Sequence, residues 1–266
     1  MKKRVISAIL IVAVFIPILF VGELPFAVFM SLLSMVGLYE LMRVRETRKS
    51  FPLVLKLFAY ILTVYFCMYN TSSIEFYNKF DYRVMAIIIF TFISPMVFIN
   101  DTKKYNLNDA LFLIGSVLFI GFSFNLIIIT RNYDINYIIY LLLITAITDT
   151  FALFTGMLVG KHKLCPTISP KKTVEGLFGG VFMGTFTAVA FYNTVISSTA
   201  PLVIVVVLTL GLCLVGQLGD LVFSTIKRYY EVKDFSNAIP GHGGILDRFD
   251  SLIFVVLAFT ILIGIL

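Results

Sequence analysis

Long apolar segments separated by short polar ones dominate the pattern of the chain. About twenty helical residues, rising about 1.5 Å each, cross a bilayer core of about 30 Å. The ten-residue alternation of a transmembrane barrel is not seen. We therefore predict an all-α, polytopic integral membrane protein with about nine transmembrane helices. The predicted spans are 5–22, 25–44, 52–69, 84–99, 109–129, 135–159, 174–196, 201–226 and 249–266.

Composition agrees with this class, because 59% of the 266 residues are hydrophobic and only 14% are charged. Soluble domains are nearer one half and one quarter. The first apolar segment is longer than a secretory signal and lacks an Ala-x-Ala site, so we interpret it as a span. The weakest span is 84–99, which is short and broken by Pro95.

Lysine and arginine collect in every second segment between the spans. With the N-terminus inside, the outer segments hold only Lys79, Arg83 and Arg131. Positive residues favour the cytoplasmic side. We therefore expect a cytoplasmic N-terminus in the inner (plasma) membrane, with loops 160–173 and 227–248 facing the cytoplasm. The basic residues behind the net charge of +6 fall in short loops between the spans, so this charge does not indicate a nucleic-acid partner.

The chain divides by its chemistry. Residues 1–105 hold few ionisable groups within the spans, and we predict a transmembrane scaffold or a homodimer surface there. Glu40 and Arg43 lie three residues apart, which predicts an interfacial ion pair on one helix face. Residues 106–266 form the predicted catalytic region. There Asp149 lies deep inside a span, where a carboxylate needs a partner, water or a metal.

The loop after residue 160 carries a candidate anion site. Ser169 and Pro170 predict a turn, and Thr173 is a predicted N-cap for a helix that Glu175 opens. Lys171 and Lys172 stand beside that helix N-terminus, and both supply positive potential. A basic loop that only fixes topology would look similar. Three glycines that would admit a ligand or another helix follow at Gly176, Gly179 and Gly180.

The segment 201–228 predicts a helix with a polar stripe at its inner end. The stripe consists of Gln217, Asp220, Ser224 and Lys227, spaced three, four and three residues apart. Gly216 and Gly219, close to this stripe, thin the helix and could admit a partner helix or a ligand.

The last loop ends in a second acidic group. Asp247, Asp250 and Ser251 share one face of an opening helical turn. If Asp220 and this turn lie at one membrane depth, their carboxylates can converge on Mg²⁺, which is usually held by one or two carboxylates plus phosphate. His242 has neither a nearby cysteine nor a nearby histidine in the sequence, so zinc is not expected.

These motifs resemble one family. The run S-x-I-K-R-x4-K-D-x-S-x2-I-P-x-H-G-G-I-x-D-R-F-D, from Ser224 to Asp250, resembles the signature of phosphatidate cytidylyltransferases, the CDP-diacylglycerol synthases. The runs G-x-x-x-G-K from Gly156 and S-P-K-K-T-x-E-G from Ser169 are similar to that family as well. The resemblance covers about residues 145–251 strongly, and the earlier part only as membrane spans.

The resemblance implies transfer of CMP from CTP to phosphatidate in the inner leaflet, with Mg²⁺, giving CDP-diacylglycerol and pyrophosphate. The implied metal ligands are Asp220, Asp247 and Asp250. The other implied catalytic residues are Lys227, Arg228, His242 and Arg248. The implied substrate-binding residues are Asp149, Ser169, Lys171, Lys172, Thr173, Glu175, Ser224, Lys233, Asp234, Gly243 and Gly244. The turn 240–244 would offer backbone amides to phosphate.

Two alternatives stay open at the level of the sequence. A related CTP-dependent polyprenol or lipid kinase would use similar residues but transfer the γ-phosphate. A cation or proton transporter could use Asp149 and Asp220 as membrane carboxylates. The long glycine-rich loop has no obvious place in a transporter.

Overall fold

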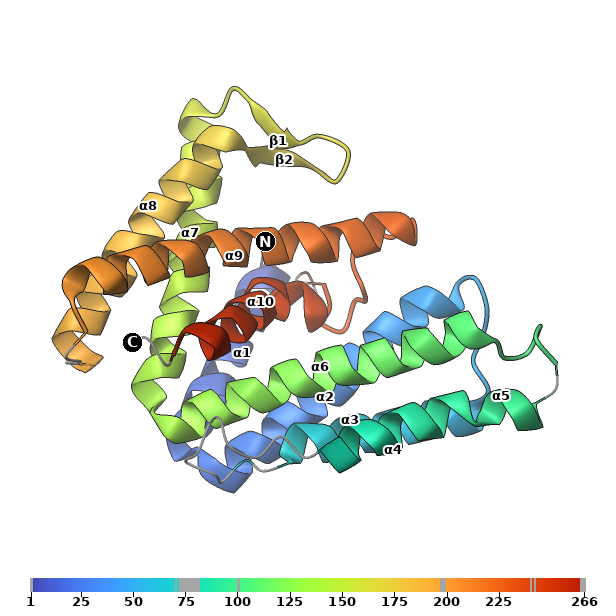
Figure 1. The fold of residues 1–266 in the computed structure, drawn as a ribbon. Coiled ribbons are helices and arrows are strands. Elements are labelled where there is room, and N and C mark those ends of the chain that lie inside the picture. The colour runs from blue at the N-terminus through green and yellow to red at the C-terminus, as the bar shows by residue number, and fades with distance from the viewer. Residues whose placement is uncertain are drawn as a thin grey trace. The chain divides into compact units, whose positions relative to one another are not determined.

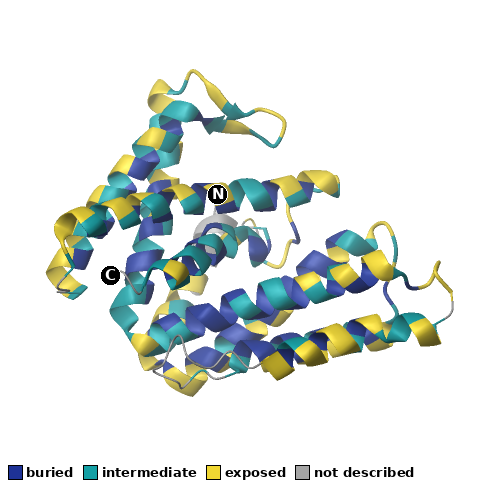
Figure 2. Ribbon diagram, viewed as in Figure 1, coloured by how far each residue is buried: buried dark blue, intermediate teal, exposed yellow. Residues whose placement is uncertain are grey.

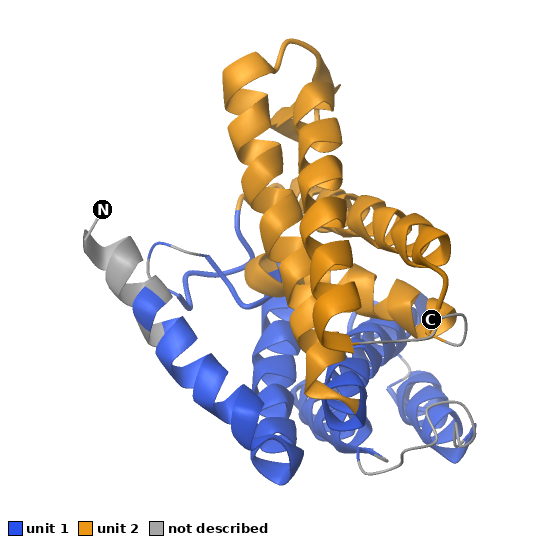
Figure 3. Cartoon of the chain, turned by 90° about the vertical axis from the view of Figure 1, so that its left-hand side faces the viewer, with its two compact units in different colours: residues 1–133, 234–246 blue, residues 134–233, 247–266 orange. Residues whose placement is uncertain are grey.

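A computed structural model describes residues 2–69, 71, 82–99, 101–196, 200–239, 241 and 243–263 (Figure 1). The chain forms two compact units, which Figure 3 separates by colour. Unit 1 holds Met1–Tyr133 and Asp234–Leu246, and unit 2 holds Asp134–Lys233 and Asp247–Leu266. The predicted division into 1–105 and 106–266 concerns chemical roles, and it stays a prediction.

The fold is nearly all helical and suited to a membrane. Five described helices are long and apolar enough to cross one: Glu23–Glu46, Leu107–Tyr133, Ile135–Val159, Val174–Ile196 and Leu202–Tyr229. Shorter apolar helices are Ile11–Val21, Leu53–Met68 and Tyr82–Phe98. Many large apolar side chains are exposed on these helices, as lipid-facing surfaces require (Figure 2). The chain is therefore a multi-pass membrane protein.

Unit 1 is a helical bundle. Its helices are α1 (Lys2–Val21), α2 (Glu23–Glu46), α3 (Leu53–Met68), α4 (Tyr82–Ile93), α5 (Pro95–Phe98) and α6 (Leu107–Tyr133). Helix α2 packs against α3 and α6, and α4 also packs against α6. The expected break at Pro95 is present, because α4 ends at Ile93 and α5 starts at the proline.

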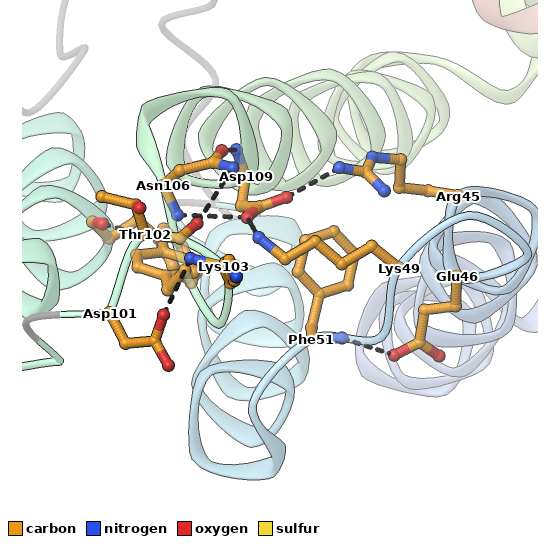
Figure 4. A network of polar contacts seen from close by, with 11 residues as sticks. Arg45, Glu46, Lys49, Phe51, Asp101, Thr102, Lys103, Asn106 and Asp109 are labelled. Carbon is orange, nitrogen blue, oxygen red and sulfur yellow. Dashed lines mark hydrogen bonds and ion pairs between the residues drawn. The ribbon is translucent and has the colours of Figure 1, made fainter.

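A buried ion cluster holds α2 against α6 (Figure 4). Asp109 is fully buried, and its carboxylate pairs with Arg45 at 2.7 Å and with Lys49. Asn106 and Asp109 also cap each other reciprocally: each side chain accepts the other's backbone N–H at 3.1 Å. The Arg45 guanidinium lies 5.6 Å from the ring centroid of Phe51. One carboxylate is thus compensated by two cations and a helix cap.

The predicted ion pair between Glu40 and Arg43 is wrong. Glu40 is fully buried, whereas Arg43 is exposed. The Glu40 carboxylate instead accepts hydrogen bonds from the distant segment Asp234–Leu246 of the same unit. Spacing along one helix could not reveal a partner about two hundred residues away.

Unit 2 contains α7 (Ile135–Val159), α8 (Val174–Phe191), a π-helical turn (Tyr192–Ile196), α9 (Leu202–Tyr229) and most of α10 (Leu246–Leu262). Helices α7 and α8 run side by side (Figure 1). Gly180 permits their close approach, because a Cβ at this position would lie only 2.5 Å from the Thr148 carbonyl oxygen. The glycines of α8 thus admit another helix, one of the two predicted alternatives.

A two-stranded hairpin replaces the irregular loop expected at 160–173. Strands β1 (Lys163–Cys165) and β2 (Ser169–Thr173) are antiparallel, with an irregular register between the Lys163–Thr173 and Cys165–Ser169 pairs. Pro170 lies in β2. A proline is tolerated there because both strands of an isolated hairpin are edges. The turn predicted at Ser169 and Pro170 is therefore wrong, because both residues lie in β2.

Candidate active site

The polar stripe on α9 is the centre of the candidate site, and all of its residues belong to unit 2. Gln217, Ser224 and Lys227 are buried, and Asp220 is half-buried. The Ser224 hydroxyl donates to Asp220 Oδ1 at 3.3 Å, one helical turn away. The predicted stripe is therefore a face that turns into the protein.

Glycines on α9 bring this stripe against α10. A Cβ on Gly219 would lie 2.8 Å from Phe254 Cβ and 2.9 Å from the backbone oxygen of Asp250. A Cβ on Gly216 would lie 3.1 Å from Val255 Cγ2. Because Asp220 follows Gly219 directly, this close approach puts its carboxylate within electrostatic range of Asp250.

A hydrogen-bonded chain links three helices and the hairpin around this point. Lys172 Nζ, at the end of β2, lies 2.7 Å from Asp220 Oδ2 and donates to Gln217 Oε1 at 3.2 Å. Gln217 Nε2 donates to Asp149 Oδ1 at 2.6 Å. Ser251 donates its hydroxyl hydrogen to Asp149 Oδ2 at 3.4 Å. The carboxylate deep in α7 is therefore part of the same network as Asp220.

Lys227 and Asp247 form a second ion pair in unit 2. Lys227 Nζ lies 2.7 Å from Asp247 Oδ1, and the two side chains are only 10% and 5% exposed. Both charges are therefore largely removed from water, where a missing partner would be costly. This pair joins the end of α9 to the first turn of α10.

Negative charge exceeds positive charge in this cluster. Asp149, Asp220 and Asp250 repel one another electrostatically, and only Asp220 has a direct lysine partner. Asp250 Oδ1 accepts the Ser251 backbone N–H at 2.8 Å, and among the described residues Asp250 forms no ion pair. With Asp247, the cluster holds four carboxylates and two lysines, an excess of two negative charges.

This charge balance fits a divalent cation. No three His, Cys, Asp or Glu side chains within the described ranges converge closely enough to enclose a metal by themselves. Mg²⁺ does not need such a cage, because it usually binds one or two carboxylates together with substrate phosphate and water. Asp220 and Asp250 interact electrostatically and are the candidate pair for such a site. Asp247 is engaged by Lys227, so its predicted role as a ligand requires that lysine to move.

The helix cap predicted at the start of α8 is confirmed. The Thr173 hydroxyl accepts the Gly176 backbone N–H at 3.1 Å. The Glu175 carboxylate accepts the backbone N–H of Lys161 at 3.1 Å and lies 2.6 Å from His162 Nδ1. In the structure Glu175 therefore closes the hairpin against α8. Its predicted contact with substrate stays a prediction.

The remaining predicted residues of unit 2 are Arg228, Lys171, Lys233, Arg248 and Ser169. Arg228 donates from Nε to the Ile168 carbonyl at 3.2 Å and from a terminal nitrogen to the Val232 carbonyl at 3.0 Å. It thus ties the hairpin turn to the end of α9. Lys171, Lys233 and Arg248 are exposed, and Ser169 is half-buried.

Four predicted residues come before α10. His242 lies outside the described residues. Asp234 is exposed and Gly244 is buried, and both belong to unit 1. Gly243 has a φ of 82°, the left-handed region that favours glycine, and its carbonyl accepts the Ile239 N–H at 2.9 Å. The glycines therefore shape a tight turn, and their binding of phosphate stays a prediction.

Gln217 is the residue whose importance the sequence understated. Its spacing placed it in the stripe, but its amide is what joins Lys172 to Asp149. A buried polar residue in the C-terminal part of an apolar helix was the available signal, because such a group needs partners on other elements.

Comparison with known proteins agrees with this geometry. A family described as the cytidylyltransferase family matches residues 2–266. A Bacillus subtilis (strain 168) protein named phosphatidate cytidylyltransferase is 35% identical over 260 residues, covering 96% of this chain and 95% of its own length. Proteins of the same name from Staphylococcus saprophyticus and Staphylococcus aureus (strain COL) are 35% and 36% identical, covering 99% of both chains. With a match along its whole length, this chain belongs to the cytidylyltransferase family.

Proposed function

We propose that the protein transfers CMP from CTP to phosphatidate, forming CDP-diacylglycerol and pyrophosphate for phospholipid biosynthesis. The observation that carries this proposal is the cluster of Asp149, Asp220, Asp250 and Lys172 on three helices and the hairpin. Relatives that match the chain from end to end are named for this reaction. The enzyme is thus a nucleotidyltransferase of the membrane.

The reaction requires little acid–base catalysis. A phosphate oxygen of phosphatidate attacks the α-phosphorus of CTP, and the bond from that phosphorus to the β-phosphate oxygen breaks. The attacking oxygen is already anionic, so no strong base is needed. Catalysis then depends on positioning the substrates and neutralising their charge. A cluster rich in fixed carboxylates and lysines is suited to both tasks.

Asp220 and Asp250 would hold Mg²⁺, with Asp149 supporting them through Gln217 and Ser251. The bound ion would neutralise phosphate charge and make the α-phosphorus more electrophilic. The excess of negative charge in the cluster supports this assignment. Asp247 would join as a ligand if Lys227 turned toward a phosphate.

Two lysines supply the positive charge on the protein side. Lys172 would bind the phosphates of CTP, and Lys227 would bind the phosphate of phosphatidate or the leaving pyrophosphate. Both now lie 2.7 Å from carboxylates, so each is held ready at the cluster by an ion pair. Triphosphate oxygens would compete for the same ammonium hydrogens.

The topology follows from the charges of the loops. We place about nine spans in the inner (plasma) membrane, with the N-terminus and the candidate site on the cytoplasmic side. The cations of the hairpin and of the end of α9 support this orientation. CTP would then approach from the cytoplasm, and phosphatidate from the inner leaflet. The first three spans would serve as a scaffold or as the surface of a homodimer.

Product analysis tests the function. Purified protein is incubated with CTP labelled in the cytosine, phosphatidate and Mg²⁺, and the lipid fraction is separated. The expected result is label in a CDP-lipid together with free pyrophosphate. A phosphorylated lipid with labelled CDP in the water phase would indicate a lipid kinase instead. Cation flux into liposomes without CTP, and no labelled lipid, would indicate a transporter.

A further inference from the structure

Glu40 is a buried carboxylate that the proposed chemistry does not use. It lies on α2 in unit 1 and is fully buried. A carboxylate inside an apolar helix costs several kcal/mol unless its partners are in place. The hydrogen-bond donors found among the described residues come from another segment of the chain, far from α2 in the sequence.

The partners lie in the segment 236–246 of the same unit. The Ser236 hydroxyl donates to Glu40 Oε1 at 2.5 Å, and the Ile245 backbone N–H donates to the same oxygen at 2.9 Å. The Leu246 backbone N–H donates to Oε2 at 2.8 Å. A Cβ on Gly244 would overlap the carboxylate. The end of the loop is thus folded around one side chain.

Two of these donors are the start of α10. The first N–H groups of a helix have no partner within the helix and are normally capped by the residue just before it. That residue here is Ile245, which cannot cap, and α10 begins at Leu246. Glu40 supplies the missing cap from a helix more than two hundred residues earlier, and its negative charge suits the helix dipole.

We propose that Glu40 is a positioning residue for cytidylyl transfer. It fixes the first turn of α10, on which Asp247 and Asp250 are the second and fifth residues. An ordinary Ser or Asp before the helix would cap it at lower cost, but it would not tie the helix start to α2. The inference rests on the proposed function, because it assigns Glu40 to the placement of those two carboxylates.

The test compares two loop variants with a matched control. Glu40→Gln keeps the shape but puts an NH₂ group against one N–H donor. Ser236→Ala removes the hydroxyl that donates to Glu40 and accepts the Ala238 backbone N–H at 3.0 Å. Glu46→Gln is the control: Glu46 is also on α2, accepts the backbone N–H of Phe51 at 3.0 Å and pairs with Lys56 at 3.0 Å, both outside the segment 236–246. For each variant, kcat, both KM values and hydrogen exchange of residues 236–250 are measured, with the thermal midpoint in detergent.

We expect kcat of Glu40→Gln to fall roughly tenfold to a hundredfold, because a misplacement of about 1 Å can cost that much. KM for CTP should change less than about threefold. This is well below the tenfold change that corresponds to about 1.4 kcal/mol of binding free energy. Exchange should rise in 236–250 only. Ser236→Ala should show a smaller loss of the same kind, and the double variant should lose less than the product of both factors. Glu46→Gln should match the parent protein.

Three results would overturn the proposal. The first is a folded Glu40→Gln protein with the kcat of the parent. The second is a loss that disappears when rates are expressed per folded molecule, with exchange raised throughout the chain. If Glu40→Gln does not fold, Ser236→Ala decides, and an unchanged kcat and exchange there would be the third. A parent protein without CDP-lipid synthesis would instead remove the proposed function itself.

Discussion

Carboxylate clusters occur in both compact units, and they differ in burial and in how their charge is compensated. In unit 1, Asp109 has Arg45 and Lys49 as partners and is also part of a helix cap. In unit 2, Asp149, Asp220 and Asp250 share one direct lysine. A group whose charge is fully compensated stabilises the fold, whereas an excess of negative charge is kept only where something positive binds. Charge balance and burial together therefore separate the structural site from the candidate active site, because Asp109 is fully buried whereas Asp220 and Asp250 are half-buried.

The largest expected effect comes from removing a carboxylate of unit 2. We expect Asp220→Asn to lower turnover about 10²–10³-fold, the loss typical when one charge-stabilising group is removed. The thermal midpoint in detergent should stay close to that of the parent, because one repulsion disappears along with the Lys172 pair. Labelled CTP incorporation measures the first and scanning fluorimetry the second.

The matched control for this variant is Asp134→Asn in the same unit. Asp134 caps α7 by accepting the Asn136 N–H at 2.8 Å, and asparagine caps a helix equally well. Turnover and midpoint should both be unchanged there. Near-parent turnover in Asp220→Asn would remove Asp220 from the metal site.

Removing the carboxylate of unit 1 should have the opposite signature. Asp109→Asn leaves two cations without their partner, and we expect a loss of about 3 kcal/mol in the free energy of unfolding, near the low end for a broken buried pair. The rate per folded molecule should not change. Asp101→Asn is the control, since Asp101 is exposed and lies 4.0 Å from Lys104. If Asp109→Asn lost rate without losing stability, the distinction between the two clusters would fail.

A smaller effect is expected at Lys172, which contacts both Asp220 and Gln217. Lys172→Ala should raise KM for CTP roughly tenfold, the value of one charge-assisted hydrogen bond of about 1.5 kcal/mol. KM for phosphatidate should change less. Lys163→Ala is the control, because Lys163 is exposed on the other strand of the hairpin. Equal KM values for CTP in Lys172→Ala and the parent would contradict the assignment.

The smallest effect concerns the helix contact beneath the cluster. Gly219→Ala inserts a Cβ 2.8 Å from that of Phe254, and we expect a cost of about 1 kcal/mol with reduced turnover, as overpacking separates α9 from α10. Gly211→Ala on the same helix meets nothing within 4 Å, so it should be neutral or stabilising by up to about 1 kcal/mol. Thermal unfolding of both proteins would show whether the close approach matters.

Several features followed from local pattern alone. The period and length of the apolar segments predicted the helices, including the break at Pro95. The spacing of Gln217, Asp220, Ser224 and Lys227 predicted one polar face, and Thr173 was predicted as a cap. These are properties of residues within one or two helical turns of each other, so the local sequence is sufficient to specify them.

Other features depended on which elements meet. The sequence by itself determined a helical membrane protein with acidic and basic residues at its helix ends. Only the tertiary structure decided that Lys172 pairs with Asp220, that Lys227 pairs with Asp247, and that Glu40 caps α10. A long side chain can reach any of several opposite charges, and the choice is made by close packing between helices that are distant in the chain. Such packing leaves no periodic mark on the sequence.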